Sequence, residues 1–407
     1  MNPSGRRIVV LAFAAMFSGM SLIWCMYFKQ MSTLDTRSVS VFTKGKMLYP
    51  SARFKEPMVS EVTTNKRPAL PDFRLENRCT RDNLKKMGKP GFFEGIPEQF
   101  LPGYKGPCFM TRKKVLRCLP HFYVIGVAKC GTTELWEKLE LHPQFFVSGI
   151  EKEADWWSPT RKRSTPFSTY LNSRSAQMVE KFQRNHSMRE WLVTADGSPT
   201  TLYEFDNWRM FFGNRYDGPI CTTADLLYAV QPKAKLVITL RDPVDRLYSH
   251  YLHFHYKHGS AQQFHEGVLS EIEKYESCRR YHSARACAYG RNINDFVTLH
   301  VGLYSVFIRD WLKVYPREQL LIYRLDEWKE DCPKVFSEVL KFVELDSLPD
   351  ETVREICARK MANSGADKKK MVGPMMDQTR RLLMNFYAES NRELSKLLGD
   401  DRYLWKR

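Results

Sequence analysis

The sequence predicts an α/β fold with a phosphate-binding loop, in which helices flank a central parallel sheet. Four runs are apolar along most of their length and predict buried strands: FYVIGV (122–127), WLVTAD (191–196), KLVITLR (235–241) and QLLIYRL (319–325). Longer stretches predict helices at 132–141, 169–184, 243–257, 304–315 and 377–398. Strands that alternate with helices in this way are typical of a parallel sheet covered on both faces, where ligands bind outside the carboxyl ends of the strands.

The N-terminal part of the chain predicts a membrane anchor. Residues 8–28 carry no charge and are long enough to span a bilayer. Arg6 and Arg7 precede this run, which predicts a cytoplasmic tail at 1–7 and a luminal position for everything after Phe28. The alternative is a cleaved signal peptide, but that would have a shorter apolar core and a small-residue cleavage site, for which IWCMYFKQMS offers no good candidate.

The rest of the chain is expected to form a luminal stem and one domain. Residues 29–115 contain several Pro, Lys and Arg and few periodic apolar stretches, which indicates a stem with an irregular lead-in. The pattern changes near Leu119, so the domain is placed at 116–407.

The charge of the chain indicates a polyanionic partner. Its 407 residues include 63 Lys and Arg against 46 Asp and Glu, a net charge of +17. This excess favours nucleic acid, an anionic membrane or an acidic polysaccharide, although a basic protein without such a partner is the alternative. The predicted luminal position excludes nucleic acid.

Ten cysteines suggest disulfides. Cys25 lies in the apolar run and Cys130 in a loop, so eight remain for pairing in an oxidising lumen. Cys278 and Cys287 are close enough to clip one loop and form the favoured pair, while the other pairings stay open. No Cys/His cluster has zinc spacing, so no metal is expected. Residues 185–187 form a glycosylation sequon.

The first stretch with chemical meaning is FYVIGVAKCGTTELWEKL (122–139). Gly126 and Gly131 keep the spacing of a nucleoside triphosphate loop, but Thr132 replaces the expected lysine and Lys129 lies inside the loop instead. The N–H groups of residues 131–133 would open a helix whose positive end favours phosphate. Lys129 would neutralise charge on a departing group. An ordinary turn between strand and helix is the alternative.

The second stretch is KLVITLRDPVDRLYSHYLHF (235–254). Arg241 ends a strand, Asp242 is a natural helix N-cap and Pro243 suits the first helical position. Ser249 lies about two turns into this helix. Arg241 and Ser249 would together hold a nucleotide phosphate at the sheet edge, and a capped helix with a surface arginine is the alternative.

These two stretches together resemble the cofactor signatures of Golgi carbohydrate sulfotransferases, the 5′-phosphosulfate loop and the 3′-phosphate element. Further similarity follows in KEADWW, DGSPTTLY, VGLYSVFIRDWL and MMDQTRRLLMNFYAESNRELSKLLGDDRYLW, so that the resemblance covers residues 116–407. RCLPHFYVIGVAKCGTTELWEKL followed by KEADWW is most similar to the N-acetylgalactosamine 4-sulfate 6-O-sulfotransferase group.

The resemblance implies transfer of a sulfuryl group from 3′-phosphoadenosine 5′-phosphosulfate (PAPS) to a sugar hydroxyl. This donor needs no magnesium site, and Lys129 matches the family lysine that stabilises the leaving phosphate. The residues implied in donor binding are Lys129, Cys130, Gly131, Thr132, Thr133, Glu134, Arg241, Ser249 and Lys369. The match at Lys369 is loose, because the run 359–374 lacks the family's basic pattern; a solvated charge run is the alternative.

The resemblance also implies a general base for the acceptor hydroxyl. Glu153, in GIEKEADWW (149–157), matches the carboxylate that related enzymes use, and Asp155 is a nearby alternative. More distant alternatives are three histidines: His250, His253 and His255. Trp156 and Trp157 would either stack on a sugar face or pack in the core.

The function expected from this resemblance is that of a single-pass type II Golgi membrane enzyme acting on a sulfated glycosaminoglycan. The expected acceptor position is the 6-O of N-acetylgalactosamine 4-sulfate in chondroitin or dermatan sulfate. The alternatives are a sulfotransferase for heparan sulfate or another glycan, and a luminal protein that binds sulfated glycans without catalysis. A binding protein would not need the full donor site, and a nucleotide kinase would need the missing lysine. The oligomeric state is left open.

Overall fold

The computed structural model describes residues 79–82, 96–97, 99–147, 152–158, 166–205, 217–290, 297–359 and 371–405. The chain divides into two units, Met1–Leu70 and Pro71–Arg407, and every described residue belongs to the second. The predicted anchor at 8–28 and Lys369 lie outside the described residues. Within the described ranges, no helix is both long enough and apolar enough to cross a membrane.

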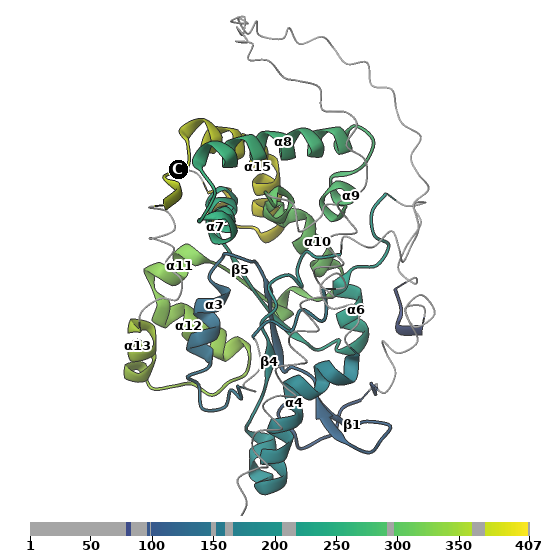
Figure 1. The fold of residues 1–407 in the computed structure, drawn as a ribbon. Helices are drawn as coiled ribbons and strands as arrows, with labels where there is room; N and C mark the ends of the chain where they lie inside the picture. Colours follow the sequence, from purple (N-terminus) through teal and green to yellow (C-terminus); the bar gives the residue numbers. More distant parts are fainter. Residues whose placement is uncertain are drawn as a thin grey trace, which may run out of the picture. The chain divides into compact units, whose positions relative to one another are not determined.

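Four parallel strands form the central sheet in the order β4–β3–β5–β6 (Figure 1). They are β3 (Phe122–Gly126), β4 (Ala195–Asp196), β5 (Lys235–Leu240) and β6 (Leu320–Arg324). Each lies within one of the four predicted runs, which confirms the predicted parallel sheet. β4 is shorter than predicted, because Val193 forms only an isolated bridge with Phe145.

The described helices include all five that the sequence predicts. They are α3 (Thr132–Leu139), α4 (Phe167–Arg184), α6 (Thr223–Val230), α7 (Pro243–His255), α8 (Ala261–Arg279), α9 (Ala284–Tyr289), α10 (Tyr304–Val314), α11 (Leu325–Glu330), α12 (Cys332–Phe342), α13 (Asp350–Ala358) and α15 (Asp377–Leu398). Short 3₁₀ helices are η4 (His186–Glu190), η5 (Leu299–Gly302), η6 (Arg317–Gln319) and η7 (Asp401–Leu404).

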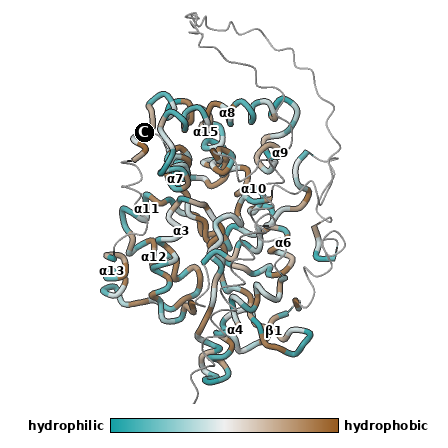
Figure 2. Tube along the Cα trace, in the orientation of Figure 1, coloured by the Kyte–Doolittle hydropathy of each residue, from teal (hydrophilic) through white to brown (hydrophobic). Residues whose placement is uncertain are grey.

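Alternate side chains of the strands supply two hydrophobic cores, one on each face of the sheet. Tyr123 and Ile125 pack into a core shared with α6, α7 and α10, whereas Phe122 and Val124 pack into one shared with α3, α12 and α13. Figure 1 shows α3, α12 and α13 on one side of the sheet and α6 and α10 on the other. The strands form the hydrophobic centre between them (Figure 2).

Part of the predicted lead-in packs on the domain. β1 (Cys108–Met110) and β2 (Leu116–Cys118) form an antiparallel hairpin, so the expected boundary at residue 116 falls at the start of β2. Ile96 is buried in the same core as Tyr123.

Four disulfides pair all eight cysteines that the sequence leaves for pairing. Cys278–Cys287 is confirmed, and the other pairs are Cys79–Cys221, Cys108–Cys118 and Cys332–Cys357. Cys130 is a buried free thiol. Asn185 of the sequon is exposed.

Candidate active site

The loop between β3 and α3 has two residues in the left-handed backbone region. Lys129 has a φ of 71° and Gly131 a φ of 93°, a region that residues other than glycine rarely adopt. A Cβ atom at residue 131 would lie 2.6 Å from Cδ1 of Leu325, so only glycine fits there. Gly131 has no side chain to cap α3, so no side chain at the N-cap occupies the N–H groups of the first helical turn, which is the arrangement that the predicted phosphate contact needs.

The second predicted stretch lies on the neighbouring strand and begins α7 as expected. The Asp242 carboxylate accepts a hydrogen bond from the Val244 N–H at 2.8 Å, and Pro243 is the first helical residue, which confirms the predicted cap. Arg241, directly after β5, and Ser249, on α7, are both half-buried. Because β3 and β5 are adjacent and parallel, both stretches begin at the same edge of the sheet.

Arg246 is a charged residue of this region that the sequence did not single out. Its side chain is fully buried, and Nη2 donates to the Thr298 carbonyl at 2.8 Å. Among the described residues, its Nε and Nη1 have no hydrogen-bond partner. The sequence signal that could have identified Arg246 was its spacing from Ser249 and His250, because residues 246, 249 and 250 lie on one face of a helix.

A tyrosine links the two predicted stretches. The Tyr304 hydroxyl, from α10, lies 3.7 Å from Cys130 Sγ and donates to the Arg241 carbonyl at 2.9 Å. Burial raises the pKa of the Cys130 thiol to about 11, so the thiol stays protonated at neutral pH and is a poor nucleophile. Cys130 therefore packs its own loop, residues 127–131 between β3 and α3, against α10; this loop is called the donor loop below, after its predicted role.

Glu153 lies next to the donor loop. Its carboxylate Oε1 accepts from Lys152 Nζ at 3.1 Å, and the same ammonium donates to Thr132 Oγ1 at 3.1 Å. The Glu153 side chain remains 39% exposed, so a hydroxyl from solution can reach it.

The alternative bases are less suitably placed. Asp155 is buried, accepts from Thr200 Oγ1 at 2.8 Å and donates its own N–H to Ser198 Oγ at 2.8 Å, which ties it into the domain. Burial, together with the charges of Arg246 and Lys129, lowers the pKa of His250 to about 2. A base this weak is poorly matched to a hydroxyl near neutral pH. Burial also lowers the pKa of His255.

The two tryptophans pack in the core rather than presenting a sugar platform. Trp157 is 1% exposed, and its Nε1 donates to the Tyr170 hydroxyl at 3.1 Å. Trp156 stacks on Tyr170 with ring centroids 5.3 Å apart and contacts Phe167. Their packing fixes the loop that carries Glu153.

The remaining predicted donor residues fall into two groups. Thr132 and Thr133 open α3, as the predicted phosphate contact requires. Glu134, in the same first turn, is buried, and its carboxylate lies 3.4 Å from Lys138 Nζ of the same helix. The role of each in donor binding stays a prediction.

Comparison with known proteins identifies the family. Residues 219–381 match the family model described as "Sulfotransferase domain". Human carbohydrate sulfotransferase 15 is 32% identical over 423 residues, which cover 88% of this chain and 73% of the human protein. The chain belongs to the carbohydrate sulfotransferase family. It is therefore a PAPS-dependent sulfotransferase, and its fold is the sulfotransferase fold.

More distant relatives of this sulfotransferase are also known. The mouse bifunctional heparan sulfate N-deacetylase/N-sulfotransferase 4 is 27% identical over 337 residues, covering 75% of this chain and 34% of the mouse protein. A solved sulfotransferase from Alicyclobacillus acidocaldarius is 24% identical, with a TM-score of 0.46 and coverage of 71% of this chain and 100% of that chain.

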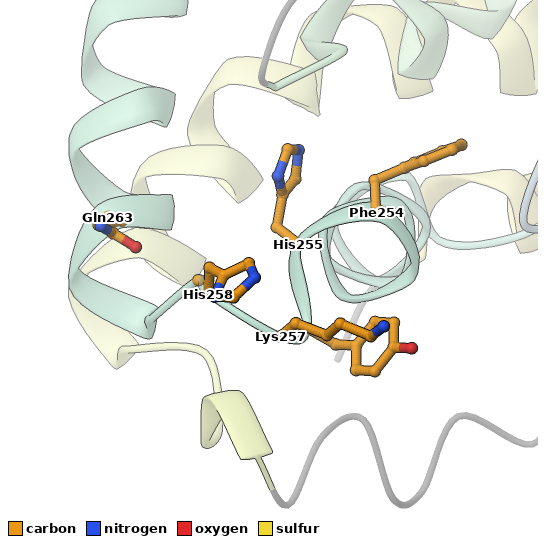
Figure 3. A pocket seen from close by; sticks show the side chains of 7 residues that line it. Phe254, His255, Lys257, His258 and Gln263 are labelled. Carbon is orange, nitrogen blue, oxygen red and sulfur yellow. The ribbon is translucent and has the colours of Figure 1, made fainter. Parts of the chain in front are cut away.

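A pocket of about 430 Å³ lies at the end of α7. Ser249 and His255 are separated by about 9 Å along the helix axis, given the helical rise per residue. Figure 3 shows the side chains of His255, Lys257, His258 and Gln263 around the turn that follows α7. The lining contains no carboxylate and consists of Phe254, His255, Tyr256, Lys257, His258, Gly259 and Gln263.

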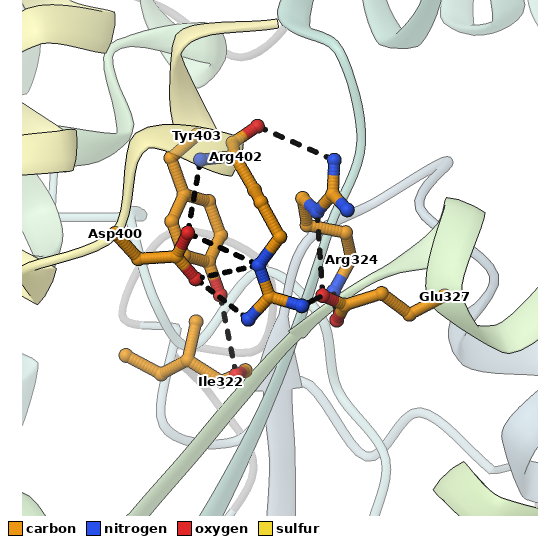
Figure 4. Close-up of polar contacts among 6 residues, drawn as sticks. All are labelled: Ile322, Arg324, Glu327, Asp400, Arg402 and Tyr403. Carbon is orange, nitrogen blue, oxygen red and sulfur yellow. Dashed lines mark hydrogen bonds and ion pairs between the residues drawn. The ribbon is translucent and has the colours of Figure 1, made fainter.

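Asp400 and η7 are bound to the end of β6 and to α11 (Figure 4). Arg402 donates to Asp400 through Nε at 2.9–3.0 Å and through Nη2 at 2.7 Å, and its Nη1 contacts Glu327 of α11. Arg324 Nη1 donates to the Arg402 carbonyl at 3.3 Å. These hydrogen bonds and ion pairs join η7 to the end of β6 and to α11. Leu325 is the first residue of α11, and its side chain lies against Gly131.

Removing this network is expected to lower stability at neutral pH more than in acid. Hydrogen bonds from Arg402 lower the pKa of Asp400, so this carboxylate contributes stability above its unfolded pKa of about 3.9 and loses it as the pH falls through the folded value. Since the Arg402 side chain is 60% exposed, the pair is screened, and Arg402→Gln should lower the melting temperature by only roughly 2–4 °C at pH 7.

Thermal melts at pH 7 and pH 3 test this expectation. Arg309→Gln is the matched control, because Arg309 is also half-exposed but makes a single ion pair, to Glu393, through Nη2. Equal shifts for Arg402→Gln at both pH values would contradict the role given to Asp400.

Proposed function

We propose that this sulfotransferase transfers the sulfuryl group of PAPS to the 6-O of N-acetylgalactosamine 4-sulfate in chondroitin or dermatan sulfate. The observation that supports it best is that the Lys152 ammonium bonds both to Thr132, at the start of α3, and to Glu153, in the loop that carries the proposed base. The donor-binding segment and this loop therefore lie next to each other. Transfer needs a donor-binding loop and a base for the acceptor within reach of each other. The human relative supports a carbohydrate acceptor.

In the proposed reaction, the α3 N-terminus and Lys129 bind the 5′-phosphosulfate, and Arg241 and Ser249 bind the 3′-phosphate. Glu153 accepts the proton of the sugar hydroxyl, whose oxygen forms a bond to sulfur. The bond from sulfur to the bridging phosphate oxygen breaks, and Lys129 stabilises the negative charge that grows on that oxygen.

The proposed topology is that of a type II Golgi membrane protein. Residues 1–7 would be cytoplasmic, 8–28 the anchor, 29–115 the luminal stem with its lead-in, and 116–407 the catalytic domain. The four disulfides support an oxidising luminal compartment.

Assay of the full-length chain in detergent, with radiolabelled PAPS and a panel of defined glycosaminoglycans, tests the acceptor. The sulfated position is then mapped by disaccharide analysis. Label at the 6-O of N-acetylgalactosamine 4-sulfate is expected. Label on heparan sulfate would favour the alternative, to which the similarity with the mouse heparan sulfate enzyme points. Donor binding without transfer to any chain would favour a glycan-binding protein.

Donor binding is expected to require Arg241 and Ser249 but no divalent metal. In the part of the chain that the structure describes, no group of three or more His, Cys, Asp or Glu side chains is arranged to hold a metal ion. Arg241→Ala should weaken binding of the desulfated nucleotide by about 10–100-fold, because a charge-assisted hydrogen bond to phosphate is lost. Ser249→Ala should have a smaller effect.

Calorimetry with this nucleotide in chelator measures both effects. Arg309→Ala, at a surface ion pair, is the control. Loss of binding on chelation would favour a metal-dependent nucleotide enzyme.

The pocket at the end of α7 is the proposed contact for a neighbouring anionic sugar of the chain. Its lining combines Lys257 with histidines and aromatic rings and contains no carboxylate.

Lys257→Gln should raise the KM for long acceptors by about 2–5-fold, as is typical of one exposed charge contact, and this increase in KM should become smaller as the salt concentration rises. Steady-state kinetics at two salt concentrations measures this. Lys274→Gln, which removes an exposed lysine paired with Glu271 on α8, is the control and should leave the KM for long acceptors unchanged. An unchanged KM for Lys257→Gln would exclude the pocket as an acceptor contact.

A further inference from the structure

Lys152 is a partly buried cation between two parts of the candidate site. Its side chain is 13% exposed, and its Nζ lies 3.1 Å from Glu153 Oε1 and 3.1 Å from Thr132 Oγ1. Lys152 and Thr132 are 20 residues apart in sequence, so this contact is made only by the fold. One ammonium thus joins the first residue of α3 to the carboxylate of the adjoining loop.

The backbone and the aliphatic part of the Lys152 side chain are also fixed by contacts. The Lys152 carbonyl accepts from the Gly197 N–H at 3.2 Å. A Cβ atom at residue 197 would lie 2.8 Å from Cγ of Lys152 and 2.6 Å from the Trp136 ring of α3, so the close packing here leaves room only for glycine. The ammonium is therefore aimed by packing against α3 and the segment after β4.

We propose that Lys152 is a positioning residue, which holds the Glu153 carboxylate beside the donor loop through Thr132. This inference rests on the proposed function, because it takes Glu153 as the base. Charge-assisted hydrogen bonds to both partners restrict the rotamers of the half-exposed Glu153 side chain. Thr132 accepts from Lys152 and so keeps its own hydroxyl proton to donate to an anion.

A double-mutant cycle tests the coupling. Lys152→Met keeps the apolar stem and removes the ammonium, and it should lower kcat by about 10–100-fold through misplacement of the base. Its effect on the Kd for the desulfated nucleotide should be less than about threefold, the range of a minor contact. In the Glu153→Gln background, Lys152→Met should cost less than about threefold in kcat, because no carboxylate is left to position. Lys152→Arg keeps the charge and should recover part of the loss.

Lys235→Met is the matched control for losing a partly buried ammonium. Lys235 is 25% exposed and bonds to both Glu344 and the Phe342 carbonyl at 2.8 Å, at the amino end of β5. It should show no coupling to Glu153→Gln. Equal losses from Lys152→Met in both backgrounds would overturn the proposal, as would a parallel loss of nucleotide affinity, which would make Lys152 a donor ligand. If Lys152→Met does not fold, Lys152→Arg and Lys152→Gln run through the same cycle.

The proposed function is tested separately by two members of the cycle. A parent chain that transfers no sulfuryl group, or a fully active Glu153→Gln variant, would refute the proposed reaction or its base. An active parent with an inactive Glu153→Gln variant, but no coupling to Lys152, would refute only the role of Lys152.

Discussion

Lys129→Ala is expected to remove most of the activity and leave the fold intact. The Lys129 ammonium is proposed to meet charge that grows only as the phosphate departs, so the loss should fall mainly on kcat, by about 10²–10³, rather than on acceptor binding. The left-handed backbone of Lys129, with a φ of 71°, is the kind of local strain that is retained at functional positions.

Lys114→Ala is the matched control for this variant. Lys114 also has a positive φ, of 56°, but it is exposed in the turn of the β1–β2 hairpin. The same side-chain truncation in the same backbone region should leave kcat unchanged there. A folded Lys129→Ala enzyme with near-normal turnover would remove Lys129 from the mechanism.

Glu153→Gln is expected to lower kcat by roughly 10²–10⁴ at saturating donor. Glutamine keeps the size of the side chain and an oxygen that accepts from Lys152, but it cannot take a proton. The Kd for the desulfated nucleotide should change little, since Glu153 faces the acceptor in the proposed reaction.

Asp155→Asn separates the two carboxylates. Asp155 is buried and bonded to Thr200 and Ser198, so its replacement should act mainly on the melting temperature. If Asp155→Asn lost turnover at unchanged stability while Glu153→Gln stayed active, Asp155 would be the base.

The central sheet was predictable because its signal is local. The runs that became β3, β5 and β6 are five or six residues long, mostly apolar and mostly buried, so the residues themselves carry the information. Helix α8 was missed because its 19 residues are mostly polar, and only four of them are buried. Helix α12 was also missed. It begins with Cys332 and Pro333, and a proline in a sequence commonly marks the end of a helix or strand, although it is well tolerated in a first helical turn.

The loops of the site were predictable in part, because glycine spacing and a helix cap are also local. The contacts between them were not. Lys152 meets Thr132, and Tyr304 meets both Cys130 and Arg241, only after separate segments pack at one sheet edge. Arg246 was missed for the same reason, since its burial is a tertiary property.

The Cys79–Cys221 disulfide has a consequence for how this protein would respond to proteases. It closes a covalent ring across 142 residues of sequence, which contains the hairpin, β3, the donor loop, α3, the Glu153 loop and β4. A single cut at any peptide bond inside that ring would leave one molecule of unchanged mass on a non-reducing gel, and two fragments after reduction. A cut before Cys79 would instead release the domain from everything upstream. A soluble fragment begun at residue 116 would lack Cys79 and Cys108, and would leave Cys118 and Cys221 as unpaired thiols open to wrong disulfides.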